Sequence, residues 1–450
     1  MNRDLTTGAP ARVLWRFCLP LFFSALVQQF YLVADSLVAG RYIGEVALAA
    51  VGNTYQITLV YQAILFGCVT GCAVVLSRLF GAGDGGAVRA AARTALLATG
   101  ALCLVLSAAG AALAPLLLRL MKTPADAMTD ALRYLQIYTF GLIVQFGYQL
   151  LIGMFAALGD AKTPLILLSA SSVINILLDV LLVKNVGLGV RGIAWATVLA
   201  QGVCGIAALV LLQRRLCLFR RARAPRAEPI FSVPIFRSML RIALPVTMQQ
   251  LIVALGGVLI QAMVNGFGVS VSAGYAAAIK INNLAIAALM AFDKGMASYS
   301  AQNAGANRTE RIRRGLGAGW KLSAAFALCI AAGYLAFQGG LMRQFLEVGA
   351  ETAKAAGEQF IRIVVPFYLV VAVKIACDGV LRGLGAMRPL LTATVADLAL
   401  RVGFAFLLSR WLGSVGIWLA WPFGWTTGTV LSAVFAVRLL RRAGKTESAI

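Results

Sequence analysis

The chain has 450 residues, of which 60% are hydrophobic and only 13% are charged, and its formal net charge is +23. Together with a mean hydropathy of +0.86, this composition excludes an ordinary soluble domain. The sequence contains no histidine, which excludes Ser–His–Asp triads, Cys–His catalysis and His-ligated metal sites. We therefore expect a membrane protein that is not an enzyme.

Apolar segments long enough to cross a bilayer recur along the whole chain. They are continuous rather than alternating, so they predict helices and not the strands of a barrel. The first segment begins like a signal peptide, but Gln28 and Gln29 follow without a cleavage site, which favours a helix. We expect an all-α membrane protein with twelve spanning helices, at residues 13–38, 46–77, 90–118, 129–156, 164–184, 190–212, 238–265, 272–301, 316–338, 355–381, 389–409 and 414–438.

The basic residues follow the connections between these helices and do not gather on one face, which argues against a nucleic-acid partner. Seven alternate segments, beginning with the N-terminus and ending with the C-terminus, hold 25 Lys or Arg residues, whereas the intervening connections hold about 10. Because cytoplasmic loops carry the excess of Lys and Arg, we expect a multi-pass protein of the cell membrane with both termini in the cytoplasm.

A basic link at residues 213–237 separates an expected N-terminal lobe (residues 1–212) from an expected C-terminal lobe (residues 238–450). The two lobes repeat each other at a spacing of about 225 residues. The repeated pairs are Leu19-Pro20 with Leu244-Pro245, Gly81-Ala-Gly83 with Gly305-Ala-Asn307, Leu158-Gly159 with Leu384-Gly385, and Gly192-Ile193 with Gly416-Ile417. Each motif alone is an ordinary turn or helix start, so the information lies in their repetition.

Six helices in each lobe give the two lobes the same orientation in the membrane. We therefore expect a pseudo-two-fold axis along the membrane normal. Parallel repeats of this kind are a known transporter architecture, with a binding cavity where the lobes face each other and alternating access by rocking of the lobes.

Two carboxylates of the first half, Asp35 and Asp179, lie deep inside expected spans, and neither has a basic residue three or four positions away. Asn175 shares a helix face with Asp179, and Thr197 shares one with Gln201, because each pair is four residues apart. A carboxylate at membrane depth costs at least a few kcal/mol. We therefore expect these faces to form a polar cluster with a function.

Such a cluster has two chemical uses. Oxygen ligands from Asp, Asn and Thr suit a hard cation such as Na⁺, and a desolvated carboxylate beside a second one is suited to proton exchange. The alternative is that the polar groups bond to one another and only hold the helices together.

The acids of the second half have bases nearby. Lys374 and Asp378 are four residues apart, as are Asp397 and Arg401, so each pair is expected to neutralise itself within one helix. Asp293, Lys294 and Lys280 also lie inside expected spans, and the sequence does not assign their partners.

Proline opens the first helix of each half. Pro20 lies about four turns before Asp35. A bend at this proline is therefore a candidate switch that moves the carboxylate, and a kink or helix start without such a role is the alternative.

Six motifs in this order resemble those of multidrug and toxic compound extrusion (MATE) transporters over nearly the full chain. They are Leu32-Val-Ala-Asp35-Ser-Leu-Val-Ala-Gly40-Arg41, Leu79-Phe-Gly-Ala-Gly-Asp84, Gly159-Asp-Ala-Lys-Thr-Pro164, Asn175-Ile-Leu-Leu-Asp179, Gln302-Asn-Ala-Gly-Ala306 and Leu381-Arg-Gly-Leu-Gly385. The resemblance implies a twelve-helix exporter that exchanges lipophilic, often cationic compounds for H⁺ or Na⁺. It implies no cofactor besides this coupling ion, and the expected partners are small-molecule substrates and membrane lipids, with the protein itself a monomer.

The branch that resembles DNA-damage-inducible F proteins binds the coupling ion in the N-terminal lobe. Its pattern maps onto the polar cluster that we inferred above from the carboxylates at membrane depth. The cluster consists of Asp35, Asn175, Asp179 and Thr197, with Na⁺ as a candidate metal. Its kinked first helix maps onto Pro20, and its tyrosine near this site resembles Tyr138. The branch of norfloxacin exporters also uses carboxylates in helices seven and ten, where this chain has Gln249, Gln250 and Gln261, and Asp378 beside Lys374. Together with Gln201, these residues are candidates for the substrate cavity or its gating.

Two alternatives remain. A flippase of lipid-linked saccharides from the same superfamily is one, although its pyrophosphate substrate favours an arginine-rich cavity and the first half is acidic at depth. An intramembrane aspartyl protease is the other, because Gly81-Ala-Gly-Asp84 has the Gly-x-Gly-Asp form and Asp35 is a candidate partner.

Overall fold

The computed structural model describes residues 4–42, 45–121, 123–220, 229–346 and 350–447. Within helices it leaves undescribed the side chains of residues 32–42, 45–53, 55, 125, 218–220 and 444–447. The side chain of Asp35 therefore lies outside the described part. The described residues form helices joined by short turns, and contain no strand.

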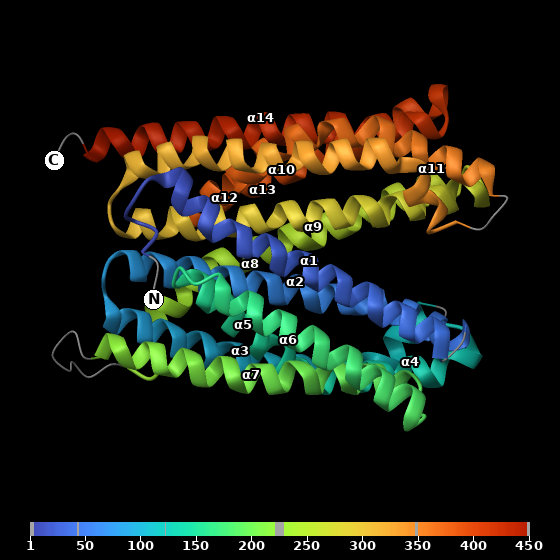
Figure 1. The fold of residues 1–450 in the computed structure, drawn as a ribbon, viewed down its shortest axis with the longest axis horizontal. Coiled ribbons are helices and arrows are strands. Elements are labelled where there is room, and N and C mark those ends of the chain that lie inside the picture. Colours follow the sequence, from blue (N-terminus) through green and yellow to red (C-terminus); the bar gives the residue numbers. More distant parts are fainter. Residues whose placement is uncertain (1–3, 43–44, 122, 221–228, 347–349, 448–450) are drawn as a thin grey trace. The chain divides into compact units, whose positions relative to one another are not determined.

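Figure 1 traces the helices in chain order. The first half contains α1 (Pro10–Tyr42), α2 (Glu45–Gly81), α3 (Gly85–Leu120), α4 (Ala125–Phe140), α5 (Leu142–Ala157), α6 (Lys162–Asp179), the π-helix η1 (Val180–Asn185) and α7 (Val190–Arg220). The second half contains α8 (Val233–Asn265), α9 (Val269–Gly305), α10 (Thr309–Arg343), α11 (Glu351–Val364), the 3₁₀-helix η2 (Val365–Phe367), α12 (Tyr368–Gly383), α13 (Met387–Leu412) and α14 (Ser414–Glu447).

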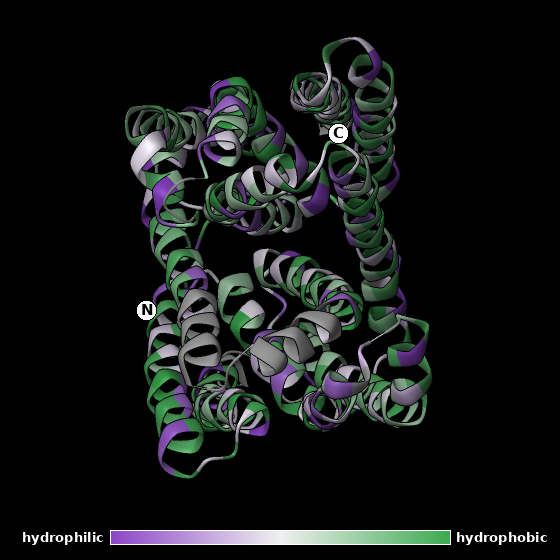
Figure 2. Ribbon diagram, turned by 90° about the vertical axis from the view of Figure 1, so that its right-hand side faces the viewer, coloured by the Kyte–Doolittle hydropathy of each residue, from purple (hydrophilic) through white to green (hydrophobic). Residues whose placement is uncertain are grey.

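The expected set of twelve spans agrees with eleven to twelve candidate spans among the described residues. Eleven described helical segments are long and apolar enough to cross a membrane, and α4 with α5 makes a twelfth if this bent pair is one span. Hydrophobic residues predominate along the helices (Figure 2), and large ones such as Phe30 and Trp411 are exposed. Exposed apolar side chains of this size suit contact with lipid.

The fourth expected span, residues 129–156, is not one straight helix, because α4 and α5 meet at a 50° bend. Gly141 lies at the bend and contacts α7, where a Cβ on this glycine would stand 2.3 Å from Val198 Cγ2. The tenth span is also interrupted, by the 3₁₀ turn η2 that contains Pro366. Proline cannot donate the backbone hydrogen bond that a continuous helix needs.

The chain forms two compact units. Unit 1 contains Phe23–Thr247, and unit 2 contains Met248–Ile450 together with Leu5–Phe22. The first turns of α1 therefore belong to unit 2, and those of α8 belong to unit 1. In this respect the units differ from the lobes expected at residues 1–212 and 238–450.

Close helix contacts explain these two assignments. In unit 2, a Cβ on Gly295 of α9 would stand 2.4 Å from Cys18 Sγ of α1. In unit 1, a Cβ on Gly67 of α2 would stand 2.1 Å from Thr247 Oγ1 of α8. Glycine allows each pair of helices to approach more closely than any larger residue would.

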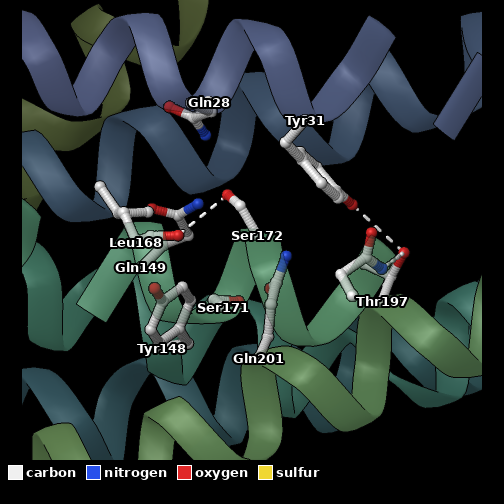
Figure 3. A pocket seen from close by; sticks show the side chains of 10 residues that line it. Gln28, Tyr31, Tyr148, Gln149, Leu168, Ser171, Ser172, Thr197 and Gln201 are labelled. Atoms are coloured by element: carbon white, nitrogen blue, oxygen red, sulfur yellow. Dashed lines mark hydrogen bonds between the residues drawn. The ribbon is translucent and has the colours of Figure 1, made fainter. Parts of the chain in front are cut away.

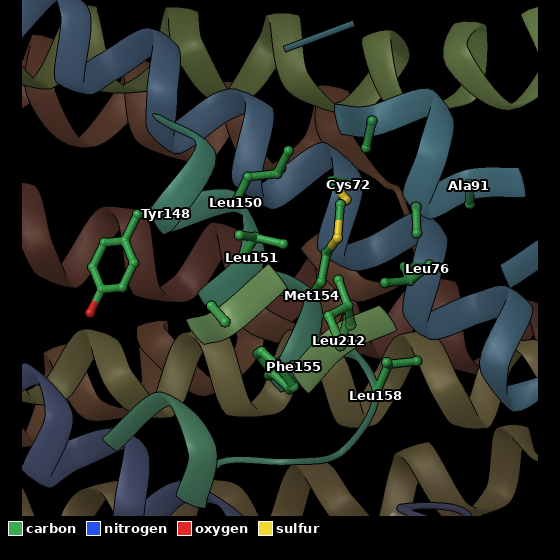
Figure 4. Packing of buried hydrophobic residues seen from close by; sticks show 14 of the residues in the cluster. Cys72, Leu76, Ala91, Tyr148, Leu150, Leu151, Met154, Phe155, Leu158 and Leu212 are labelled. Carbon is green, nitrogen blue, oxygen red and sulfur yellow. The ribbon is translucent and has the colours of Figure 1, made fainter. Parts of the chain in front are cut away.

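The core of unit 1 is built from the apolar faces of α2, α3, α5 and α7. Leu76, Met154, Phe155 and Leu212 gather there (Figure 4), and each is buried. This packing fixes α5 and α7, which together with α6 carry most of the polar residues described next.

Candidate functional site

Unit 1 contains a small pocket with polar lining residues between α1, α5, α6 and α7. Amide and hydroxyl side chains form most of its wall, and no charged side chain is part of its described lining. Figure 3 shows the lining residues, which are Gln28, Tyr31, Tyr148, Gln149, Leu168, Ser171, Ser172, Asn175, Thr197 and Gln201. Such a lining can bind ligands by hydrogen bonds and can hold water.

Thr197 joins three helices in this pocket. Its Oγ1 donates to the carbonyl oxygen of Ile193 (3.2 Å) one turn earlier on α7. A hydroxyl has one proton and two acceptor lone pairs. Thr197 can therefore accept from the Tyr31 hydroxyl of α1 (3.2 Å) and from Asn175 Nδ2 of α6 (3.4 Å). The ring of Tyr31 extends from α1 toward this hydroxyl in Figure 3.

Asp179 lies one turn after Asn175, and the two side chains are 0% and 2% exposed. α6 ends at this residue and continues as the π-helix η1. Single-turn π segments widen the helix locally and occur often at functional sites. A buried carboxylate beside such a segment is a plain candidate for binding an ion or a proton.

The four predicted coupling residues are thus placed in part. Asn175 and Thr197 come together as predicted, and Asp179 is buried on the same face of α6. Asp35 belongs to α1, but its side chain lies outside the described residues. In the part of the chain that the structure describes, no three His, Cys, Asp or Glu side chains gather as a metal site would require. A sodium site here would therefore depend on amide and hydroxyl oxygens as well as carboxylates, and Asn175 and Thr197 supply these.

Several pocket residues were not predicted from the sequence. Ser171 lies one turn before Asn175 on α6, so the spacing 171, 175 and 179 already indicates one polar face. Gln28 and Tyr31 on α1 are three residues apart, a spacing that also places side chains on one helix face. The predicted Gln201 does line the pocket, one turn after Thr197.

Tyr138 lies in a different part of unit 1. Its hydroxyl accepts a hydrogen bond from Gln62 Nε2 (2.9 Å), and its ring lies 6.1 Å from that of Tyr61 and 6.3 Å from that of Tyr134. It is not among the residues that line the pocket. Pro20, the predicted bend, lies inside α1, which continues as one helix on both sides of it.

In unit 2, both predicted ion pairs within a helix are confirmed. Lys374 Nζ lies 2.6 Å from Asp378 Oδ2 on α12, and an Arg401 guanidinium nitrogen lies 2.6 Å from Asp397 Oδ1 on α13. The second oxygen of Asp378 accepts a hydrogen bond from Ser432 Oγ (2.5 Å) on α14.

The acid whose partner the sequence did not assign, Asp293 on α9, forms an ion pair with Arg382 on α12. Arg382 also donates to Gln249 Oε1 (3.4 Å), and Gln249 Nε2 donates to Thr394 Oγ1 (2.8 Å). Gln249, a predicted cavity residue, is therefore buried in a hydrogen-bonded network. Arg382 was not singled out from the sequence, although it belongs to the motif Leu381-Arg-Gly-Leu-Gly385.

The remaining predicted residues of unit 2 are dispersed. Gln261 Nε2 donates to Asn265 Oδ1 (2.8 Å) at the end of α8, and Gln250 is half-buried on the same helix. Lys280 Nζ lies 5.9 Å from the centre of the Phe345 ring. Lys294 has Asp293 and Arg382 as electrostatic neighbours.

Comparison with known proteins gives matches over most of the chain. The chain is 29% identical to the probable multidrug resistance protein YpnP of Bacillus subtilis over 92% of both chains, and 25% identical to YoeA of the same organism over 95% of this chain and 92% of the relative. Its similarity to DNA damage-inducible protein F of Escherichia coli, 27% identity, covers only 46% of this chain and 45% of the relative. The predicted branch therefore has weaker support than the family.

Solved structures share the fold. An outward-facing MATE-family multidrug resistance transporter superposes with a TM-score of 0.91 at 21% identity, over 99% of both chains. A transporter from Pyrococcus furiosus described as having a binding pocket of reverse polarity superposes with a TM-score of 0.90, also at 21% identity, over 98% of both chains.

The sequence model of the MatE family matches this chain twice, at residues 20–181 and 245–407. These two matches confirm the internal repeat at the spacing that the motifs predicted. With both halves matched in this way, the chain belongs to the MatE family of multi-pass membrane transporters, the family that its motifs resemble.

Proposed function

We propose that this protein exports lipophilic, often cationic small molecules across the cell membrane in exchange for H⁺ or Na⁺, by alternating access. The observation that supports it most is the polar pocket of unit 1, where Asn175 and Thr197 meet beside the buried Asp179. Two relatives, each matched over 92% of its own length, are named as probable multidrug resistance proteins, which supports the same kind of substrate.

Asp179 and Asp35 are the proposed coupling residues. Asp35 follows Tyr31 by four positions in the sequence, the spacing at which residues of a helix share a face, and Tyr31 contacts Thr197. A proton or Na⁺ would neutralise carboxylate charge at membrane depth, where such charge is costly. Asn175 and Thr197 would supply neutral oxygens to Na⁺, or hydrogen bonds to a protonated carboxyl.

Coupling follows if the ion and the substrate compete for the charged carboxylates of the site. When the carboxylates are charged, they favour a cationic substrate, and when they are neutralised, that attraction is lost. Helix α1 would transmit the change, since it carries Tyr31 and Asp35 and contains Pro20 in its interior.

The proposed membrane topology follows from the Lys and Arg residues in the connections between helices. Both termini would face the cytoplasm, and the protein would act as a monomer in the cell membrane, in contact with lipid through its exposed apolar side chains. Cysteines placed at each terminus and labelled from one side of intact cells test this orientation.

The decisive experiment uses purified protein in liposomes, with pH and Na⁺ gradients imposed separately and the efflux of cationic and neutral dyes followed. Asp35→Asn and Asp179→Asn are each expected to abolish gradient-driven efflux. Asp126→Asn, at an exposed carboxylate at the start of α4, is the matched control and should transport as wild type does. Coupled efflux that persists undiminished in both Asp35→Asn and Asp179→Asn overturns the mechanism.

Thr197 gives a finer test. Thr197→Ser keeps the hydroxyl that contacts Tyr31 and Asn175, whereas Thr197→Val keeps the shape and removes the oxygen. We expect Thr197→Ser to retain most coupled efflux and Thr197→Val to lose at least tenfold, which corresponds to about 1.4 kcal/mol.

A further inference from the structure

Unit 2 contains a group of charged side chains around Lys374 on α12. Its ammonium lies 2.6 Å from Asp378 Oδ2, and Ser432 Oγ of α14 donates to the other oxygen of the same carboxylate (2.5 Å). Both oxygens of Asp378 therefore have a donor. The lysine and the aspartate side chains are only 12% and 9% exposed.

A second carboxylate, that of Asp397, also lies close to Lys374. The point where a Cβ on Gly428 of α14 would stand is 2.9 Å from Lys374 Cε and 3.2 Å from Asp397 Oδ2. Asp378 and Asp397 are both electrostatic neighbours of this lysine, and Asp293 is a third. Because Gly428 has no side chain, the Lys374 side chain and the Asp397 carboxylate can both pack against α14 at this position.

Every acid of this group has its own base. Asp397 pairs with Arg401 (2.6 Å), whose guanidinium carbon lies 4.6 Å from the centre of the Trp421 ring. On the facing helix α9, Asp293 pairs with Arg382, and Lys294 is a further cation near that pair. Among the described residues, Lys374 is therefore the cation assigned to Asp378.

The internal repeat relates this group to the pocket of unit 1. The pair Leu158 and Leu384 gives an offset of 226 residues for the helices on either side of it, and Gly192 with Gly416 gives 224 for α7 and α14. At these offsets Lys374 corresponds to Tyr148, Asp397 to Ser171 and Arg401 to Asn175. All three counterparts line the pocket of unit 1.

The two units thus use equivalent positions in opposite ways. Unit 1 has neutral amides and hydroxyls there, and Asp179 lies one turn after Asn175 on α6. In unit 2, the same positions carry Lys374, Asp397 and Arg401, which together with Asp378 form two ion pairs. Two carboxylates with a lysine ammonium beside them need no further cation.

We propose that the Lys374 ammonium is a built-in substitute for a coupling cation at Asp378 and Asp397, so that unit 2 takes up no ion in wild type and gains a monovalent-cation site when the ammonium is removed. This deepens the proposed function, because it leaves ion coupling to unit 1 alone. Without the ammonium, Asp378, Asp397 and Ser432 offer the oxygen donors that suit Na⁺, or a carboxylate pair that shares a proton.

The test uses the full-length protein with the proposed coupling residues of unit 1 neutralised, Asp35→Asn/Asp179→Asn, so that its result does not depend on coupling in unit 1. Binding of ²²Na⁺ and proton uptake after a downward pH jump are measured in this background. The background alone is expected to bind neither ion. Adding Lys374→Met is expected to create one saturable site per chain for Na⁺ or for H⁺, and the two measurements separate these ions.

Two further variants are matched controls. Lys374→Arg keeps the positive charge and should gain no site. Lys374→Met with Asp378→Asn removes the charge on both partners, and should lose the site that Lys374→Met created. Because Lys374→Met leaves a buried carboxylate without its base, its melting temperature should rise when choline chloride is replaced by NaCl or when the pH is lowered, whereas that of the double variant should not.

The inference is overturned if Lys374→Met binds neither ion and its melting temperature responds to neither Na⁺ nor pH. It is also overturned if Lys374→Arg gains the same site. Failure of the proposed function looks different, since gradient-driven efflux would then persist in Asp35→Asn and Asp179→Asn, whatever the result at Lys374.

Discussion

Arg382 on α12 pairs with Asp293 on α9, 89 positions earlier in the chain, and the two side chains are only 4% and 1% exposed. An ion pair so deeply buried stabilises little by itself, because both charges lose their hydration, but removing one partner leaves a costly buried charge. This pair fixes α9 against α12 inside unit 2. It also brings Gln249 of α8 into the same network through Arg382.

Arg382→Met is expected to lower the free energy of unfolding by about 3–5 kcal/mol, because the Asp293 carboxylate loses its base. Adding Asp293→Asn removes the remaining charge and should restore a large part of that loss. Unfolding of the purified variants in detergent measures both changes. Arg314→Met is the control, since its pair with Glu310 is 72% and 52% exposed, and should cost less than about 1 kcal/mol. A double variant as unstable as Arg382→Met contradicts the argument.

Gly424 on α14 lies against the Asp397 and Arg401 pair. A Cβ there would stand 2.6 Å from Asp397 Oδ1 and 2.8 Å from the Asp397 backbone oxygen, so Gly424→Ala should cost about 1–3 kcal/mol by overpacking. Gly403→Ala on α13 is the matched control, because a Cβ at that position would have no neighbour within 4 Å. That variant should be neutral or slightly stabilising. Equal melting temperatures for the two variants would show that the helices separate without cost.

The sequence predicted those parts of the site that depend on spacing within one helix. Lys374 with Asp378, and Asp397 with Arg401, are four residues apart, so the helix itself brings them together. The same spacing placed Asn175 and Asp179 on one face of α6. The spans followed from hydropathy, since a bilayer requires about 20 consecutive apolar residues.

Contacts between helices were harder to predict from the sequence, because spacing along the chain does not say which helices pack together. Tyr31 and Thr197 are 166 positions apart, and Asp293 and Arg382 are 89 apart. Gln249 was a candidate cavity residue because it lies in the helix where the branch of norfloxacin exporters has a carboxylate, and in the structure it has one partner on α12 and one on α13. The exchange of the first turns of α1 and α8 between the units depends in the same way on close contacts at Gly295 and Gly67.

Asp160 holds the turn between α5 and α6. Its Oδ1 accepts from the backbone nitrogens of Lys162 (3.0 Å) and Thr163 (3.1 Å), its Oδ2 accepts from Thr163 Oγ1 (2.6 Å), and the carboxylate pairs with Arg215 of α7. Asp160→Ala should therefore lower the free energy of unfolding by at least as much as the loss of a helix cap does, which is roughly 0.5–2 kcal/mol. Asp160→Asn, which keeps an acceptor for the cap, should cost less.

Asp84 provides the comparison for this prediction. It caps α3 through one bond, from the Ala87 backbone nitrogen to Oδ1 (3.0 Å), and it is exposed. Asp84→Ala should therefore destabilise less than Asp160→Ala in the same unfolding assay. The reverse order would mean that the ion pair with Arg215 and the bond to Thr163 add nothing to the cap.

Residues 5–8 are held by the end of α9 and the start of α10, all within unit 2. Leu5 donates its backbone N–H to Gln302 Oε1 (3.1 Å) and accepts from Asn303 Nδ2 (3.2 Å). Arg311 donates to the carbonyl oxygens of Thr7 (2.7 Å) and Gly8 (2.5 Å). This gives the motif Gln302-Asn-Ala-Gly-Ala306 a definite role, which is to fix the start of α1.

Arg311→Ala should loosen this attachment, because it removes charged hydrogen bonds that contribute about 1.5–3 kcal/mol each. Amide hydrogen exchange in peptides covering residues 5–22 should become at least tenfold faster, while the rest of α10 keeps its protection. Arg313→Ala is the control, since that side chain is 70% exposed and pairs with Glu310. Because α1 continues from this attachment to Tyr31 and Asp35, Arg311→Ala should also slow coupled efflux, whereas unchanged exchange together with unchanged efflux would show that the start of α1 is held by its apolar contacts alone.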